Sequence, residues 1–308
     1  MYFKEVKPKV VNISGIPFGA QPGEYPPVLI GSITTRDKID EKTADVVRRQ
    51  KTYRREYGVP CLVDIYVREE SHIDRIDFVL DNTEPEEPFL IDLPGELDIR
   101  KKAIEYAHKR DCLSRVIYNS VGVGTSDEEF RMIRDSGVQS AIVLAYDSAD
   151  HSPEGALYLL KGGGLLEKVI GAGIKNILID PGIGSFTPDR PFNSFKSITF
   201  LKVHTEYPVG CAPCNAVEGW KYIRELRKTA RNGGDEDKKR YRRILQKTIE
   251  TANAIAHDRG ADFLIYGNLK NSDEAVAIAH GFHNNILLSE NSFFGVKPGT
   301  ENHPVSKL

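Results

Sequence analysis

The sequence lacks an excess of charge of either sign and has no long apolar run. Its 308 residues carry 42 Lys and Arg against 44 Asp and Glu, a net charge of −2. Such a balance argues against nucleic acid or an anionic membrane as a partner. No apolar run approaches the roughly 18 residues of a membrane span, and the first residues lack the apolar stretch of a signal peptide. We therefore expect a soluble cytoplasmic protein whose partner is a small molecule or another protein.

Cysteine is also scarce. The four cysteines are Cys61, Cys112, Cys211 and Cys214, and only the last two form a close pair. A zinc site normally needs a second such pair or nearby histidines. We therefore expect buried, reduced thiols and no bound metal.

The first 27 residues differ in pattern from the rest of the chain. Two short alternating stretches, 3–7 and 9–13, predict a β-hairpin, and a connection rich in Pro and Gly follows it. Such a hairpin could plug the closed end of a barrel. Since 308 residues fit one large domain, we expect residues 1–27 to form the hairpin and connection, and residues 28–308 to form a single catalytic domain.

From residue 28 onward, apolar runs of strand length alternate with segments of helical periodicity. The predicted strands are 28–34, 61–67, 89–92, 114–119, 140–146, 176–180, 208–215 and 261–268. The predicted helices include 41–57, 71–80, 97–109, 153–171, 193–205 and 238–258. Eight strand–helix repeats predict an α/β fold, a (β/α)8 TIM barrel. A doubly wound open sheet is the alternative, but the first turn lacks the GxGxxG pattern.

Asp or Asn residues close several of the predicted strands, namely Asp92, Asn119, Asp180 and Asn215. Asp64, at the end of the apolar part of the second strand, is a weaker candidate. The carboxyl ends of barrel strands carry the catalytic residues, although each of these side chains could instead cap a helix or set a turn. Carboxylates and amides at one mouth suit a ligand rich in N–H donors, such as a 2-amino-4-oxo pteridine or a purine.

The motif Asp-Pro-Gly-Ile-Gly at 180–184, with the other strand-end residues, resembles the pterin-binding barrels. These are the dihydropteroate synthases and the methyltetrahydropterin:corrinoid methyltransferases. The segments 21–33, 117–120 and 207–210 and the final Glu-Asn-His-Pro-Val-Ser-Lys-Leu resemble the family of the H subunit of tetrahydromethanopterin S-methyltransferase. The late strands lack the Ser-x-Arg pair that a dihydropteroate synthase needs.

This resemblance implies methyl transfer between N5 of a tetrahydropterin and a corrinoid, and it implies a homodimer. The corrinoid (methylcobalamin) would be carried by another protein, because the chain has no Asp-x-His-x-x-Gly motif. Departures from the methanogen pattern at 34–37 and 211–215 favour bacterial relatives that use tetrahydrofolate during the breakdown of methylated amines such as glycine betaine. The alternatives are a tetrahydromethanopterin-specific H subunit of the methanogen S-methyltransferase and a non-catalytic pterin-binding subunit.

The resemblance also implies roles for individual residues. Asn215 would lie beside N5 of the pterin and act in catalysis, while Asp92, Asn119 and Asp180 would bind the pyrimidine edge, with Asp64 as a further binding residue. The mixed-charge run 227–243 is typical of a solvated helix face, with docking of a corrinoid protein as the alternative.

Overall fold

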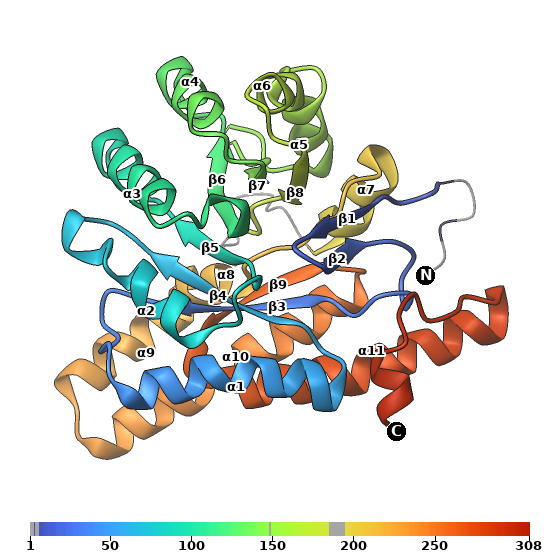
Figure 1. Cartoon of the computed structure of the whole chain (residues 1–308). Helices are drawn as coiled ribbons and strands as arrows, with labels where there is room; N and C mark the ends of the chain where they lie inside the picture. Colours follow the sequence, from blue (N-terminus) through green and yellow to red (C-terminus); the bar gives the residue numbers. More distant parts are fainter. Residues whose placement is uncertain (1–2, 4–5, 148, 185–194) are drawn as a thin grey trace.

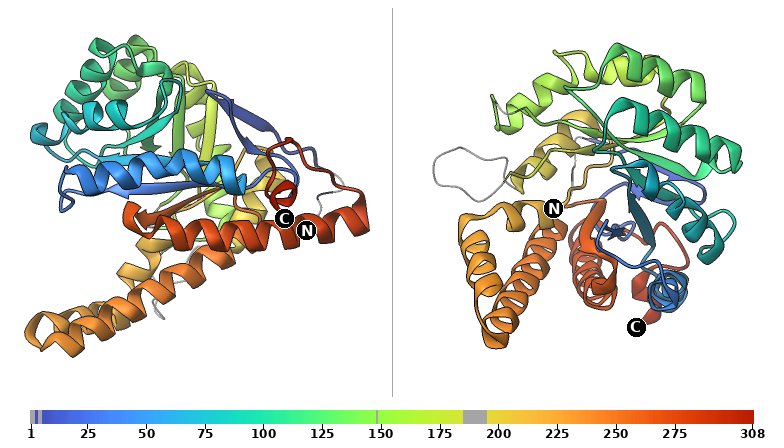
Figure 2. Two further views of the ribbon diagram at one scale, coloured as in Figure 1. Left: turned by 60° about the horizontal axis from the view of Figure 1, so that its bottom comes forward. Right: turned by 90° about the vertical axis from the view of Figure 1, so that its left-hand side faces the viewer.

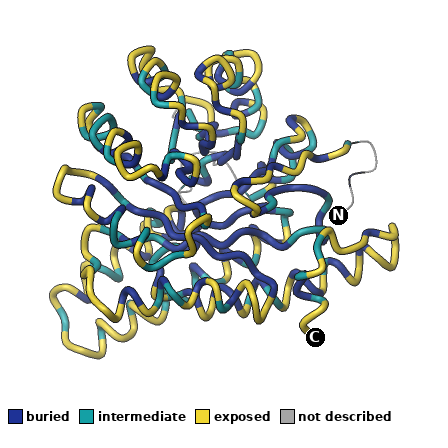
Figure 3. Tube along the Cα trace, in the orientation of Figure 1, coloured by how far each residue is buried: buried dark blue, intermediate teal, exposed yellow. Residues whose placement is uncertain are grey.

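The computed structural model describes residues 3, 6–147, 149–184 and 195–308, and it has an α/β fold (Figure 1). Parallel strands form a seven-stranded sheet in the order β8-β7-β6-β5-β4-β3-β9. These strands are β3 (Val28–Ile33), β4 (Cys61–Tyr66), β5 (Phe89–Asp92), β6 (Val116–Gly122), β7 (Ser140–Leu144), β8 (Asn176–Asp180) and β9 (Phe263–Asn268). Most of their residues are buried because helices cover the outer face (Figure 3).

Helices follow the strands and surround the sheet, as the right-hand view of Figure 2 shows. They are α1 (Glu41–Tyr57), α2 (Arg75–Asn82), α3 (Leu97–Lys109), α4 (Asp127–Ser136), α5 (Pro153–Leu160), α6 (Leu165–Gly171), α7 (Lys196–Thr205), α8 (Pro213–Gly219), α9 (Lys221–Asn232), α10 (Asp235–Asp258) and α11 (Ser272–Phe294). Short 3-10 segments are Glu70–His72, Leu113–Arg115, Leu269–Asn271 and Pro304–Lys307. Ser126 caps the start of α4, since its hydroxyl accepts a hydrogen bond from the backbone N–H of Glu129.

The expected strand at 208–215 does not form as a regular strand. Val209 makes a single parallel bridge to Ile179 of β8, and Cys211 makes another to Leu264 of β9. The chain then enters α8 at Pro213, because proline has no N–H for a strand ladder and is favoured at a helix start. The segment between α7 and α8 thus joins the two edge strands of the sheet through isolated bridges.

Two predicted helices also differ from the structure. The helix expected over 153–171 is divided into α5 and α6, because Gly164 adopts a left-handed φ of +70° after two other glycines. The helix expected at 71–80 is a 3-10 turn followed by α2, which buries Ile76 and Val79. The start expected near residue 193 lies outside the described residues, and α7 is described from Lys196.

The hairpin at the start of the chain is present, but its strands differ from those predicted. β1 (Val10–Ile13) pairs with β2 (Ile16–Gly19), and the loop residues Ser14 and Gly15 both have positive φ, as a tight two-residue hairpin turn requires. The stretch predicted at 3–7 includes residues 4 and 5, which lie outside the described residues, and Val6 and Lys7 form no strand.

The hairpin fills the inner side of the sheet with apolar side chains. Phe18 is fully buried, and its ring lies 6.5 Å from that of Phe263 in an edge-to-face arrangement. The hairpin shares a core cluster with inward residues of all seven strands, among them Ile30, Leu62, Leu90, Ile117, Ile142, Leu178 and Phe263. Within the described residues, no helix combines the length and the apolar composition that a membrane span requires.

Candidate functional site

A polar layer lies directly above the apolar layer that the hairpin covers. Side chains alternate between the faces of a strand, so the residue two positions after an inward apolar residue also points inward. In five strands that residue is polar and lies nearer the carboxyl end: Ser32, Asp64, Asp92, Asn119 and Asp180 follow Ile30, Leu62, Leu90, Ile117 and Leu178. Because the strands are parallel, the structure brings these five side chains to one end of the sheet, which we call the mouth.

Asp64 is the most deeply buried carboxylate of the mouth, with 2% of its surface exposed. The Ser32 hydroxyl donates a 2.7 Å hydrogen bond to Asp64 Oδ2 from the neighbouring strand. Burial raises the pKa of Asp64 from 3.8 to about 6, although the Ser32 hydrogen bond and the nearby Asn119 carboxamide favour the charged form. Asp64 Oδ1 has no hydrogen-bond partner among the described residues. This buried acceptor is therefore free to receive a donor from a ligand.

Asp92 ends β5 and lies opposite Asn119 in the ladder between β5 and β6. Burial raises the pKa of Asp92 well above its ordinary value, and the nearby charge of Asp64 raises it further, while Arg100 opposes this shift. Two carboxylates that disfavour each other's ionisation therefore share the mouth. A ligand that donates hydrogen bonds to both would relieve that repulsion.

Asp180 ends β8, and the turn after it fixes its carboxylate. The backbone N–H of Gly182 donates a 2.7 Å hydrogen bond to Asp180 Oδ1. Gly182 has φ +66°, and a Cβ there would lie 2.6 Å from Cβ of Tyr146, so the turn requires glycine. Burial raises the pKa of Asp180 from 3.8 to about 7, and the Gly182 hydrogen bond lowers it in part. The mouth therefore contains a second carboxyl group that titrates near neutral pH.

Asn215 does not close a strand, contrary to the prediction from the sequence. It is the third residue of α8, and its side chain is exposed. Its neighbour Cys214 lies closer to the sheet, since its thiol donates to the carbonyl of Ile265 at 3.5 Å. Of the predicted site residues, Asp64, Asp92, Asn119 and Asp180 are therefore brought together in the strand layer, and Asn215 lies on the helix after the irregular segment.

The expectation that the cysteines are buried and reduced agrees with the structure, in which all four are buried free thiols. Burial raises the pKa of Cys211 well above its ordinary value and that of Cys214 to about 12, and nearby carboxylates, including Asp180 and Asp64 respectively, add to these shifts. Both thiols are therefore protonated at neutral pH and lie near the mouth. Among the described residues, no three His, Cys, Asp or Glu side chains converge as metal ligands.

A second polar cluster, missed from the sequence, joins the ends of β3 and β9. Asp37 accepts hydrogen bonds from Asn268 at 2.9 Å and from the Thr34 hydroxyl at 2.7 Å, and it forms an ion pair with Lys270 at 3.1 Å. Burial raises the pKa of Asp37, but these partners outweigh it and leave the pKa below its ordinary value. These hydrogen bonds and this ion pair hold the loop after β3 in place.

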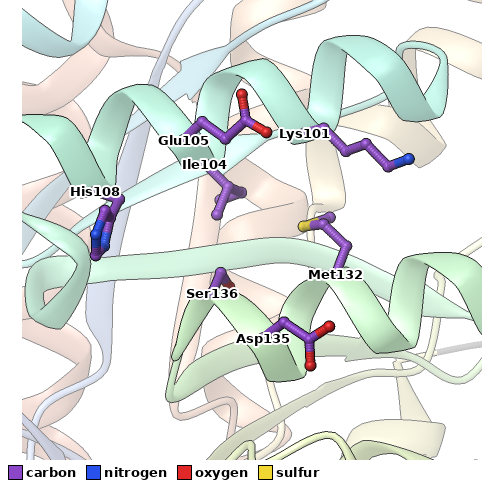
Figure 4. Close-up of a pocket in the computed structure, with 7 residues that line it drawn as sticks. All are labelled: Lys101, Ile104, Glu105, His108, Met132, Asp135 and Ser136. Atoms are coloured by element: carbon purple, nitrogen blue, oxygen red, sulfur yellow. The ribbon is translucent and has the colours of Figure 1, made fainter.

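The surface also has a groove away from the mouth (Figure 4). It has a volume of about 320 Å³ and lies between α3 and α4 on the outer side, lined by Lys101, Ile104, Glu105, His108, Met132, Asp135 and Ser136. None of the predicted site residues lines it. The candidate site is therefore the mouth, where buried carboxylates and an amide lie at one end of the sheet and can accept hydrogen bonds from the N–H groups of a ligand.

Known proteins resemble this chain over nearly its whole length. A family model described as "Tetrahydromethanopterin S-methyltransferase MtrH subunit" matches residues 6–290. The H subunit of the tetrahydromethanopterin S-methyltransferase of Methanopyrus kandleri is 30% identical over 330 residues, which cover 99% of this chain and 98% of that protein. The protein of the same name from Methanosarcina acetivorans is 30% identical over 336 residues, which cover 100% of both chains. The H subunit of the putative methyltransferase mtx of Methanosarcina barkeri is 28% identical over 328 residues, again covering 100% of both chains.

These matches confirm the resemblance that the sequence motifs indicate. The chain belongs to the MtrH family, named for the H subunit of tetrahydromethanopterin S-methyltransferase, and is a methyltransferase.

Proposed function

We propose that this chain transfers a methyl group between N5 of tetrahydromethanopterin and a corrinoid carried by a partner protein. The observation that carries the proposal is the convergence of Asp64, Asp92, Asn119 and Asp180 at one end of the sheet, in a chain of this family. The relatives are named for tetrahydromethanopterin. Their names favour this pterin over tetrahydrofolate and the methylated-amine pathway, which the sequence alone led us to prefer.

The donor and acceptor pattern of the mouth fits a reduced pterin. The pyrimidine ring of a pterin presents an exocyclic amine and a ring N–H side by side, which can meet one carboxylate with two parallel hydrogen bonds. The free Asp64 Oδ1 and the partly buried Asp92 supply such acceptors. The Asn119 carboxamide can both donate and accept, so it suits the carbonyl or ring nitrogen of the same edge.

The chemical step depends on placing the methyl group between two large partners. When bound, the corrinoid supplies the cobalt atom that exchanges the methyl group. In the direction from pterin to cobalt, N5 must be protonated or strongly hydrogen-bonded in the transition state, because a bare amide-like nitrogen is a poor leaving group. We assign this hydrogen bond to the Asn215 carboxamide, whose exposed position at the start of α8 suits contact with a ligand above the strand ends.

The proposal includes a closed eight-stranded barrel with the hairpin at its amino-terminal end and residues 28–308 as the catalytic unit. The bridges of Val209 to β8 and of Cys211 to β9 support closure, because they link both edges of the sheet through one segment. The relatives are named as subunits, which supports protein partners for this chain. We extend the proposal to a cytoplasmic homodimer that receives a corrinoid protein at the mouth.

An anaerobic assay tests this function. The purified chain is mixed with methylcobalamin and either tetrahydromethanopterin or tetrahydrofolate, and the loss of the methyl–cobalt absorption band is followed in the visible spectrum. We expect faster loss with tetrahydromethanopterin. Faster loss with tetrahydrofolate would contradict the choice of pterin. Pterin binding without any loss of the band, even with the cognate corrinoid protein, would instead identify a non-catalytic pterin-binding subunit.

A further inference from the structure

A cleft with a strong positive charge lies beside the mouth. It has a volume of about 400 Å³ and is lined by five basic residues, one acid and three other residues: Arg36, Arg227, Arg231, Lys238, Arg242, Glu218, Ala230, Tyr241 and Leu245. The whole chain has a net charge of −2, so this concentration of positive charge is local. Cations gathered around one hollow repel each other, and an anion bound between them would relieve that repulsion.

The cleft joins segments that are far apart in sequence. Arg36 lies in the loop between β3 and α1, whereas the other basic residues come from α9 and α10. In Figure 1 the turn between α9 and α10 lies on the same side of the molecule as the start of α1, which follows the carboxyl end of β3. The left-hand view of Figure 2 shows the α9–α10 pair projecting from the body of the protein. Residues of the charged run 227–243 therefore line a cleft together with a residue of a distant loop.

Two elements near the mouth, the loop after β3 and α8, also contribute residues to the lining of this cleft. Ser32, which donates a hydrogen bond to Asp64, lies in β3, and Arg36 follows four residues later in the loop after β3. Asn215 and Glu218 are both in α8, three residues apart, which is a separation of about 5 Å along a helix axis. A ligand that reaches Asn215 is thus within a short extension of the cleft.

The interior of the cleft is ordered by protein contacts, but several of its cations are not paired. Arg227 donates hydrogen bonds to the Tyr241 hydroxyl at 2.8 Å and to Glu218 at 2.7 Å, so it is held in place. In the part of the chain that the structure describes, no ion pair or side-chain hydrogen bond engages the guanidinium groups of Arg36, Arg231 or Arg242. Three arginines are therefore available to a ligand, each with several donors that match carboxylate or phosphate oxygens.

We propose that this cleft is a second binding subsite, which takes the anionic end of the side chain of the reduced pterin, either a carboxylate or a phosphate. The identity of the ligand rests on the function proposed above, whereas the capacity of the cleft to bind an anion does not. The cleft is concave and its lining includes the apolar residues Ala230 and Leu245, features that suit a small ligand better than a flat protein surface does. Binding at both ends would hold the pterin in one orientation across the mouth.

Two variants separate the cleft from general charge effects. The cleft variant is Arg231→Ala/Arg242→Ala, which removes two exposed and unpaired cations and so leaves folding unaffected. The matched control is Arg240→Ala/Arg243→Ala, which removes the same charge from exposed positions of α10 that do not line the cleft. Arg36→Ala tests the contribution of the loop independently. Arg227 is left unchanged because it holds Tyr241 and Glu218.

Calorimetric binding of three probes decides the proposal: inorganic pyrophosphate, the reduced pterin with its anionic side chain, and the same reduced pterin ring without a side chain. We expect the cleft variant to bind pyrophosphate and the complete pterin about tenfold to a hundredfold more weakly than the wild type, and to bind the bare ring equally well. Arg36→Ala should show a smaller loss of the same kind. The control variant should match the wild type with all three probes.

The outcomes distinguish this subsite from the function proposed for the mouth. If no form binds any pterin but the wild type binds pyrophosphate through the cleft arginines, the pterin function fails and the anion site remains. If the cleft variant binds pyrophosphate and the complete pterin like the wild type, the subsite is overturned. If the cleft variant binds both anions like the wild type but no longer binds a corrinoid protein, the cleft is a docking surface for that protein. This result also overturns the proposed subsite. Use of a phosphate-bearing and a carboxylate-bearing pterin in parallel identifies which group the cleft takes.

Discussion

The Ser32 hydroxyl donates a hydrogen bond to Asp64 Oδ2 between two adjacent strands, and the other carboxylate oxygen of Asp64 has no partner among the described residues. Asp64 is therefore oriented by the protein but only partly satisfied. A buried acceptor without a donor destabilises the folded state, so its presence fits a site that gains its last hydrogen bond from a ligand.

Replacement of Asp64 should stabilise the ligand-free protein. The folded pKa of about 6 exceeds the ordinary 3.8, so the contribution of this group to stability is complete below pH 3.8 and is lost as the pH rises to about 6. Asp64→Asn should therefore raise the free energy of unfolding by about 1–3 kcal/mol above pH 6, with little change near pH 4. Urea unfolding at both pH values measures this, and a less stable variant at pH 7.5 would contradict it.

Pterin affinity should depend on pH through Asp180. Burial raises its pKa to about 7, and only the ionised carboxylate accepts two N–H donors. Affinity should fall by up to about tenfold for each pH unit below 7, because protonation competes with binding. Titration of a reduced pterin from pH 5.5 to pH 8.5 measures the slope, and Asp180→Asn should bind weakly with a flatter profile. An unchanged profile in this variant would assign the pH dependence to another group.

Asn215 should affect the chemical step and not folding or pterin binding. Loss of one hydrogen bond that strengthens in the transition state typically lowers kcat by about 10²–10³. Asn215→Ala should show this loss, with a pterin Kd within about threefold of the wild type and an unchanged unfolding midpoint, since the side chain is exposed. Asn215→Gln, which keeps the carboxamide, should recover part of the rate. Wild-type kcat in Asn215→Ala would exclude the proposed role.

The segment between α7 and α8, which bridges β8 and β9, should depend on one buried ion pair for its stability. Lys202 Nζ of α7 pairs with Asp262 Oδ1, with side-chain exposures of 1% and 5%, and Asp262 Oδ2 accepts the backbone N–H of Val209 at 2.9 Å. Lys202→Met should cost about 3–5 kcal/mol because it leaves a buried carboxylate without its cation. Lys202→Met/Asp262→Asn should recover much of that loss, since the carboxamide still accepts from Val209. Thermal unfolding of both variants checks this, and equal destabilisation would exclude charge as the cause.

The strands and the polar layer were predictable from the sequence where the alternation of side chains is regular. Leu90 and Asp92, or Leu178 and Asp180, are two residues apart, so burial of the first places the second on the same inner face. Ser32 obeys the same rule and was missed because a serine after Gly31 gives no distinct signal of a site. The hairpin partner differs from the prediction because β2 (Ile16–Gly19) lies within the stretch rich in Pro and Gly that reads as a connection.

The remaining errors come from local backbone chemistry and from contacts between distant segments. Pro213 ends the strand pattern after Ala212 and starts a helix, which moves Asn215 from a strand end to α8. The cleft depends on the approach of Arg36 to α10, about 200 residues later in the chain, and no periodic pattern encodes such a contact. The sequence therefore identified most of the residues of the mouth and the charged run 227–243, but not the contact that brings Arg36 to that run in one cleft.

Single-turnover methyl transfer with strand-end variants tests most directly whether the mouth binds the reduced pterin for catalysis. The methyl group is labelled on N5 of tetrahydromethanopterin, and its appearance on the corrinoid is measured for the wild type, Asp92→Ala, Asp180→Ala and an exposed control, Asp81→Ala of α2. We expect transfer by the wild type and the control. Each mouth variant should bind the pterin about tenfold to a hundredfold more weakly and transfer correspondingly less at limiting pterin. Wild-type affinity and transfer in both mouth variants would show that the pterin binds elsewhere.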